Sequence, residues 1–355
     1  MTAKPFKILI VGPSWVGDMM MAQVLFQLLR QQNPTAIIHV LAPKWSHALL
    51  ARMPEINHAI ELPFGHGAFQ LKKRFEFAKT LRVEQYDQAI VIPNSWKSAL
   101  IPFFAKIPKR TGWCGEYRFG LLNDVRYLNK KELPLMVQRM AALAYSNSAL
   151  MPANLPTPKL TTCITHEKNR TALLQKYSLT ADKPILALCP GAEFGPSKIW
   201  PSYHYATVAN QKIKEGFSVW IFGSPNDCAI ANDIQNHTDN HCENLVGKTT
   251  LSDAVDLLSL AHCVVTNDSG LMHVAAALNR DVVAIYGSTS PDFTPPLSDK
   301  AKILKLNLDC QPCFQRHCPL KHHHCMTQLL PEQVLKANGS SGSSLSAKRI
   351  HESNE

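Results

Sequence analysis

The sequence lacks the features that would place the protein in a membrane or assign a common nucleotide-binding motif. No apolar run approaches the roughly 20 residues that a membrane-spanning helix needs, and the first residues, MTAKPFKILIVG, enter a predicted strand without a signal-peptide pattern. Neither a GxGxxG fingerprint nor a Walker loop is present, so the motifs support neither a dinucleotide-binding protein nor a P-loop NTPase. With 45% hydrophobic and 18% charged residues, we expect a soluble, cytoplasmic, globular protein.

Net charge is also missing from the second half of the chain. Residues 151–355 carry 18 basic and 18 acidic residues, whereas residues 1–150 carry 19 Lys and Arg against 9 Asp and Glu. A basic surface of this kind suits an anionic partner such as phospholipid, nucleic acid or a phosphorylated sugar, although a merely solvated basic face is the alternative.

The order of apolar segments predicts two α/β domains. A chain of 355 residues is too long for one ordinary core. Each half begins with a buried strand, a turn and a helix, first in KILIVG followed by residues 19–30 and again in PILALCPG followed by residues 202–215. We therefore predict two Rossmann-like, doubly wound domains that face a central cleft, where the strand ends would bind a ligand.

The predicted boundaries follow the composition. A Pro- and Thr-rich connection covers residues 150–183, and the last residues are rich in Gly and Ser. We place an N-terminal domain at residues 1–165, a C-terminal domain at 166–337 and a disordered tail at 338–355.

The segment Val264–Pro296 is the most informative stretch of the chain. It predicts a strand, a polar turn containing Asp268, Ser269 and Gly270, a helix that carries His273, and a second strand. A helix that starts directly after such a turn offers free N–H groups to a phosphate. Asp268 as a helix cap and His273 as a core residue are the structural alternatives.

Two other turns of the second domain suit phosphate as well, and one charged residue lies beside each domain's first turn. The turns contain Gly191 and Gly223, and Lys198 stands between a Gly-rich turn and a helix start, where a cation meets a diphosphate. In the first domain Asp18 occupies a strand-to-helix junction. It is either a helix-capping carboxylate or a general base that takes a proton from a substrate hydroxyl.

Four of the ten cysteines are clustered near the end of the second domain. Cys310, Cys313, Cys318 and Cys325 form a C-x2-C-x4-C-x6-C pattern interleaved with histidines. The spacing suits a structural zinc site, and the alternatives are reduced thiols on a surface loop or, less favoured, a redox role.

Four separated motifs carry a resemblance to a known family. KILIVGPSWVGDMMMAQ, VIPNSWKSALIPFFAKIPKRTGW, CPGAEFGPSKIWP and VVTNDSGLMHVAAALNRDVVAIYGSTSPDFTPP resemble the lipopolysaccharide heptosyltransferases, in the same order along the chain. The resemblance implies a GT-B fold and an inverting transfer of L-glycero-D-manno-heptose from ADP-heptose that requires no bound metal. It further implies that the acceptor is the inner core on lipid A, already bearing Kdo and a first heptose.

The resemblance also implies roles for individual residues. Asp18 matches the family's general base, which takes the proton of the acceptor hydroxyl, and Lys198 matches the donor-phosphate motif and would hold the departing diphosphate. The expected donor-binding residues are Gly191, Ala192, Glu193, Gly223, Ser224, Asp268, Ser269, Gly270 and His273. The basic residues that we expect to meet the acceptor are Lys97, Arg110 and Arg118.

The expected setting is the cytoplasmic face of the inner membrane, in peripheral contact with anionic lipid and without a nucleic-acid partner. The alternatives are a heptosyltransferase that acts on another core position, a sugar-nucleotide epimerase of similar architecture, and a protein that binds sugar nucleotides or lipid A without turnover.

Overall fold

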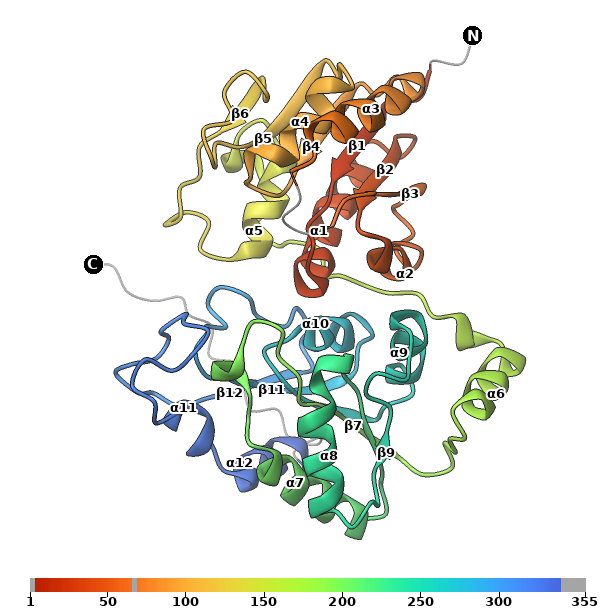
Figure 1. Ribbon diagram of the computed structural model, residues 1–355, viewed down its shortest axis with the longest axis vertical. Helices are drawn as coiled ribbons and strands as arrows, with labels where there is room; N and C mark the ends of the chain where they lie inside the picture. Colours follow the sequence, from red (N-terminus) through yellow and green to blue (C-terminus); the bar gives the residue numbers. More distant parts are fainter. Residues whose placement is uncertain (1–3, 66–68, 340–355) are drawn as a thin grey trace.

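The computed structural model describes residues 4–65 and 69–339 and contains two lobes, one above the other in Figure 1. Asn338 and Gly339, the first two residues of the predicted tail, belong to the last helix. Residues 340–355 lie outside the described residues, so the disordered tail stays a prediction, as do the domain boundaries.

The N-terminal lobe is built on a six-stranded sheet whose strands all run parallel, in the order β3-β2-β1-β4-β5-β6. This is the strand order of a Rossmann fold. The strands are β1 (Lys7–Val11), β2 (Ile37–Ala42), β3 (His58–Glu61), β4 (Gln88–Val91), β5 (Lys109–Trp113) and β6 (Asp124–Arg126). The helices are α1 (Val16–Gln32), α2 (His47–Leu50), α3 (Leu71–Leu81), α4 (Trp96–Phe104) and α5 (Met136–Ala141).

The C-terminal lobe repeats this topology with a second parallel sheet, in the order β12-β11-β10-β7-β8-β9. The strands are β7 (Ile185–Cys189), β8 (Ser218–Ile221), β9 (Glu243–Asn244), β10 (Cys263–Asn267), β11 (Asp281–Tyr286) and β12 (Ala301–Lys305). The helices are α6 (Glu167–Lys176), α7 (Ser202–Lys214), α8 (Cys228–His237), α9 (Leu251–Leu258), α10 (Gly270–Ala277), α11 (His324–Thr327) and α12 (Pro331–Gly339). The predicted class, two doubly wound α/β domains of the GT-B type, is confirmed.

Alternating side chains explain why both sheets are covered on two faces. In β1, Ile8 and Ile10 enter one apolar cluster, whereas Leu9 and Val11 enter another on the opposite face. A strand side chain points to the opposite face from its neighbour. A parallel strand buried on both sides therefore reads as the continuous apolar run ILIV.

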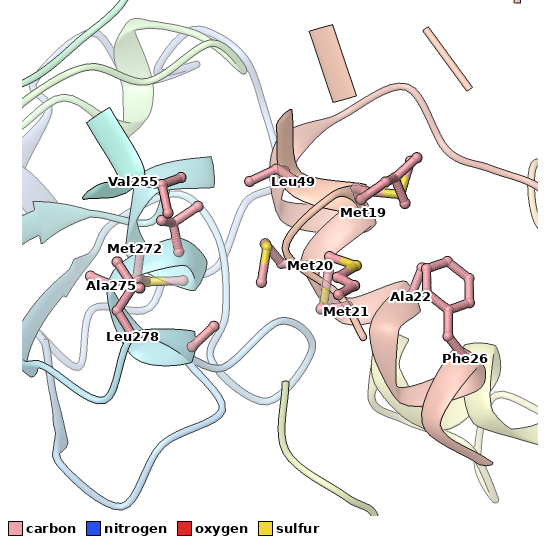
Figure 2. Packing of buried hydrophobic residues seen from close by; sticks show 14 of the residues in the cluster. Met19, Met20, Met21, Ala22, Phe26, Leu49, Val255, Met272, Ala275 and Leu278 are labelled. Atoms are coloured by element: carbon pink, nitrogen blue, oxygen red, sulfur yellow. The ribbon is translucent and has the colours of Figure 1, made fainter. Parts of the chain in front are cut away.

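One apolar cluster runs from the first sheet to the second through helices α1 and α10. Figure 2 shows Met20 and Met21 of α1 on the side toward Met272 and Ala275 of α10. All four side chains are at most 2% exposed. Methionine is unbranched and fills irregular gaps, which suits it to this contact. The lobes are therefore joined through α1 and α10, the helices that follow β1 and β10.

Polar contacts join the two lobes at a second place, beside the connecting chain. Arg52, after α2, forms a buried ion pair with Asp256 of α9 at 2.6 Å. The backbone N–H of Cys163, in the connection, donates to the other oxygen of Asp256 at 2.9 Å. The buried amide of Gln23 holds Lys159 through both the backbone N–H and the carbonyl. The predicted connection is therefore tied to both lobes at residues 159–163.

No helix among the described residues is long and apolar enough to cross a membrane.

Candidate functional site

The predicted reactive residues lie at the points where the strand order of each sheet reverses. These points fall between β1 and β4 in the first sheet and between β7 and β10 in the second. Ligands of doubly wound sheets bind outside the carboxyl ends of the strands at such points. Asp18 lies in the first turn of α1 after β1, Lys198 follows β7 in the short 3-10 helix Pro196–Lys198, and Asp268 follows β10.

Two glycines let the amino-terminal ends of α1 and α10 meet between the lobes. A Cβ atom on Gly17 would lie 2.9 Å from Cδ2 of His273, and a Cβ atom on Gly270 would lie 2.7 Å from Cβ of Val16. Any larger residue at either position would force the helices apart. Helix amino termini carry partial positive charge and unpaired N–H groups, so this junction suits an anion.

Asp18 lies at this junction, and its environment suits a proton acceptor. Burial raises the pKa of its carboxyl from 3.8 to about 6, and the positive charge of Lys198 limits the rise. Lys198 belongs to the other lobe, so the fold brings the two predicted catalytic residues into electrostatic contact. A carboxylate with a pKa just below neutrality is mostly ionised at pH 7 and still binds a proton readily.

Lys198 is held in place by a buried carboxylate. Its Nζ donates to Oδ2 of Asp268 at 2.6 Å and to the Asp268 carbonyl at 3.3 Å. The same Oδ2 accepts a 2.6 Å hydrogen bond from Oγ1 of Thr289. An ammonium has three N–H donors, so one remains for a ligand oxygen. Sequence reasoning missed Thr289, because a threonine 21 residues away carries no signal that it meets Asp268.

The structure bears on the structural alternatives for Asp268 and His273. The N-cap of α10 is Ser269, and within the described residues its side chain makes no capping hydrogen bond, so the capping alternative for Asp268 is wrong. His273 is 6% exposed, and burial lowers its pKa to about 4 although the Asp268 carboxylate opposes the shift. His273 is therefore a neutral imidazole beside Gly17. Ser269 and Gly270 are half-buried at the start of α10.

The turns at Gly191 and Gly223 surround a carboxylate that the sequence analysis did not single out. A Cβ atom on either glycine would come within 3.0 Å of the Asp227 side chain. Oδ2 of Asp227 accepts 2.8 Å hydrogen bonds from the backbone N–H and the hydroxyl of Ser224. Ser-Pro-Asn-Asp over residues 224–227 is a capping-box pattern, and that pattern was the available signal. Ala192 and Glu193 continue the turn after β7, and Glu193 is exposed.

The three predicted acceptor-binding residues have different surroundings. Arg118 is 1% exposed, donates to the carbonyls of Pro93 and Trp113, and has its pKa lowered to about 10 by burial. This burial disfavours a contact between Arg118 and an acceptor. Arg110 donates to the carbonyls of Ile107 and Leu121 near the start of β5. Lys97 is half-buried near the start of α4, and its part in acceptor binding stays a prediction.

The structure does not support the predicted zinc site. Cys310, Cys313, Cys318 and Cys325 do line one small pocket together with His322 and His323. Nevertheless, no group of three or more His, Cys, Asp or Glu side chains in residues 4–65 and 69–339 is arranged to hold a metal ion. Sequence spacing brought the thiols into one loop region but did not direct them to a common point, which tetrahedral coordination requires.

Two Rossmann-like lobes, with a carboxylate on one and a cationic turn on the other, are the arrangement of the GT-B class. The family model "Glycosyltransferase family 9 (heptosyltransferase)" matches residues 74–324. Lipopolysaccharide heptosyltransferase 2 of Escherichia coli K12 is 49% identical, over 93% of this chain and 97% of its own. Lipooligosaccharide heptosyltransferase 2 of Haemophilus influenzae is 53% identical, over 84% and 88%. The chain therefore belongs to glycosyltransferase family 9, the heptosyltransferases.

A solved structure agrees with this assignment. The structure of Escherichia coli ADP-heptose LPS heptosyltransferase II is 46% identical in sequence and superposes with a TM-score of 0.84, covering 94% of this chain and 97% of the other. The protein is thus a glycosyltransferase enzyme.

Proposed function

We propose that this enzyme transfers L-glycero-D-manno-heptose from ADP-heptose to the first heptose of the Kdo–lipid A inner core, with inversion at the sugar carbon. The relatives whose names specify the second heptosyltransferase, at 49% and 53% identity, support this choice of reaction. The single structural observation that carries the proposal is the approach of Asp18 on one lobe to the Lys198–Asp268 pair on the other.

In the proposed reaction the acceptor hydroxyl attacks the sugar carbon from the face opposite the diphosphate. Asp18 takes the hydroxyl proton as the new glycosidic bond forms and the bond to the diphosphate breaks. One in-line displacement inverts the configuration, so one base and one stabilised leaving group are sufficient. The partly buried Asp18, with a pKa of about 6, is suited to the first role.

The leaving ADP acquires negative charge, and the C-terminal lobe supplies positive groups for it. The remaining N–H donor of Lys198 and the backbone N–H groups at Ser269 and Gly270 would bind the diphosphate oxygens. A well-placed donor to developing charge contributes about 3 to 4 kcal/mol in comparable sites. The Asp227 carboxylate, between the Gly191 and Gly223 turns, is suited to accept hydrogen bonds from the ribose hydroxyls of the donor.

The same arrangement leads us to propose that transfer requires no metal ion, because lysine and two helix termini already place positive charge at the leaving group. Transfer rates in EDTA are expected to stay within about twofold of those in buffer. A rate lost in EDTA and restored by a divalent metal would overturn this part of the proposal.

The acceptor position is tested by presenting ADP-heptose with lipid A cores that carry zero, one or two heptoses. Mass spectrometry of the products is expected to show one added heptose only on the core that already carries one. Product on the heptose-free core would indicate the first heptosyltransferase instead. Conversion of ADP-heptose without any lipid acceptor would indicate an epimerase.

A further inference from the structure

The outer side of helices α3 and α4 exposes aromatic and aliphatic side chains where a solvated surface would be polar. Exposure is 44% for Leu71, 37% for Phe75, 42% for Trp96 and 40% for Phe103. Phe69, directly before α3, is 44% exposed, and its ring lies 5.1 Å from that of Trp96. Isolated exposed apolar residues need no explanation, but a contiguous group marks an interaction site.

These residues belong to one continuous surface because α3 and α4 pack side by side, as Figure 1 shows at the top of the N-terminal lobe. Leu71 and Phe75 are four residues apart and share the outer face of α3. The ring of Phe75 lies 5.3 Å from that of Phe104, which in turn lies 5.6 Å from that of Phe103.

Lysines surround the aromatic rings. Lys72, Lys73 and Lys79 of α3 are exposed, and Nζ of Lys79 lies 4.5 Å above the Phe75 ring. Glu76 is the acidic residue of this helix. We call the exposed residues Phe69, Leu71, Phe75, Trp96 and Phe103, together with Lys72, Lys73 and Lys79, the α3–α4 face.

The C-terminal lobe has no counterpart to this face among its described helices. In α6 to α12, Tyr203 is the one large hydrophobic side chain exposed in the described residues. The net charge follows the same division, because the whole excess of +10 belongs to residues 1–150. Among the described helices, exposed apolar side chains combined with an excess of positive charge therefore occur on the N-terminal lobe.

The position of the α3–α4 face relates it to the site. Trp96 is the first residue of α4 and follows the carboxyl end of β4, which pairs with β1 in parallel. Asp18 follows the carboxyl end of that same β1. The face therefore starts at the edge of the sheet that carries the proposed base and extends away from it along α3 and α4.

We propose that the α3–α4 face docks on the surface of an anionic lipid bilayer. Aromatic rings and short apolar side chains enter the headgroup region of a membrane, and lysines beside them pair with lipid phosphates. This inference rests on the proposed function in one respect, namely that the acceptor sugar is anchored in a lipid. Docking then presents that sugar to the edge of the sheet that carries Asp18.

The test is flotation of the full-length chain with vesicles of phosphatidylcholine, with and without phosphatidylglycerol. We expect binding to the anionic vesicles, little binding to the neutral ones, and partial release by high salt. The double variant Lys72→Glu/Lys73→Glu should reduce binding by about tenfold or more, because two charges that attract the anionic surface are replaced by charges that it repels. Leu71→Ser/Phe75→Ser should reduce the binding that persists in high salt.

The matched control is Lys183→Glu/Lys214→Glu, which reverses two exposed lysines of the C-terminal lobe and should bind anionic vesicles nearly as the parent does. Equal losses in both charge-reversed pairs would mean nonspecific attraction and would overturn the proposal. So would parental binding by Lys72→Glu/Lys73→Glu, or a stable dimer in solution that Leu71→Ser/Phe75→Ser dissociates.

A second assay separates this inference from the proposed reaction. Turnover on a delipidated, water-soluble core acceptor should be the same for the parent and for both α3 variants, whereas turnover on acceptor embedded in anionic vesicles should fall. No turnover on any acceptor, with vesicle binding intact, would reject the proposed reaction and leave the docking surface standing. Equal turnover by all proteins on the embedded acceptor would reject a role for docking in catalysis.

Discussion

The two lobes share one strand order but differ in the chemistry placed at the point where that order reverses. In the N-terminal lobe the residue at this point is Asp18, a carboxylate whose pKa is raised to about 6 by burial. In the C-terminal lobe it is Lys198, ion-paired with the buried Asp268 and supported by Thr289. A repeated architecture therefore carries the proposed proton acceptor on one side and the proposed anion site on the other, and the proposed transfer needs both.

Asp18 offers the most direct test of the difference between the two lobes. Asp18→Asn removes the proposed base with almost no change in size, so kcat should fall by about two to four orders of magnitude. Affinity for ADP-heptose, measured by calorimetry, should be unchanged because the base acts on the acceptor. Asp292→Asn removes an exposed carboxylate (83%) and serves as the control. Near-parental kcat in Asp18→Asn would remove this residue from the mechanism.

The connection between the lobes is tested at the ion pair of Arg52 and Asp256, whose side chains are 5% and 7% exposed. Arg52→Met leaves a buried carboxylate without its cation, so the free energy of unfolding should fall by about 3 to 5 kcal/mol. Urea denaturation measures this. The partly exposed Lys7–Glu84 pair offers a control, since Glu84→Gln should cost about 1 kcal/mol or less. Equal losses in the two variants would contradict the role given to burial.

Lys198→Ala tests the proposed anion site of the C-terminal lobe. Removing one donor to the developing charge should lower kcat by about a hundredfold, and ADP should bind more weakly as well. Thr289→Val keeps the lysine but removes one hydrogen bond to Asp268, so its effect on both quantities should be smaller and in the same direction. Unchanged kcat and unchanged ADP affinity in Lys198→Ala would move the phosphate site elsewhere.

The pH dependence sharpens the contrast without a substitution. Asp18 must be ionised to act as a base, and burial raises its pKa to about 6. The rate should therefore be nearly constant above pH 7 and fall about tenfold per pH unit below 6. The donor-saturated rate of the parent from pH 4.5 to 8 measures this. A midpoint near 4 would mean that Asp18 titrates as an ordinary exposed carboxyl.

The sequence predicted the strands that are buried on both faces, because such strands read as uninterrupted apolar runs. ILIV in β1 and ILALC in β7 are of this kind. It did not predict β5, β6 or β12, whose sequences KRTGW, DVR and AKILK mix charged and apolar residues. Strands at or near the edge of a sheet keep one side polar, so their apolar pattern is weak.

The site was predicted in part for a similar reason. A turn after a buried strand indicates where a ligand site will lie, and Asp18, Lys198 and Asp268 all occupy such turns. The direction in which a basic side chain points cannot be predicted from the sequence in this way. Arg118 looks like the other basic residues around it in the sequence, yet it is buried against the carbonyls of Pro93 and Trp113.

By itself, the sequence determined two α/β domains, the order of their buried strands along the chain and the polar turns after those strands, because periodicity and turn chemistry are local. Only the tertiary structure decided that Lys198 pairs with Asp268, that Thr289 donates to the same carboxylate, and that the side chains of the four neighbouring cysteines are not arranged around a common point. Lys198, Asp268 and Thr289 follow β7, β10 and β11, which lie side by side in the second sheet. Neither that pairing of strands nor the direction of a side chain can be read from sequence spacing.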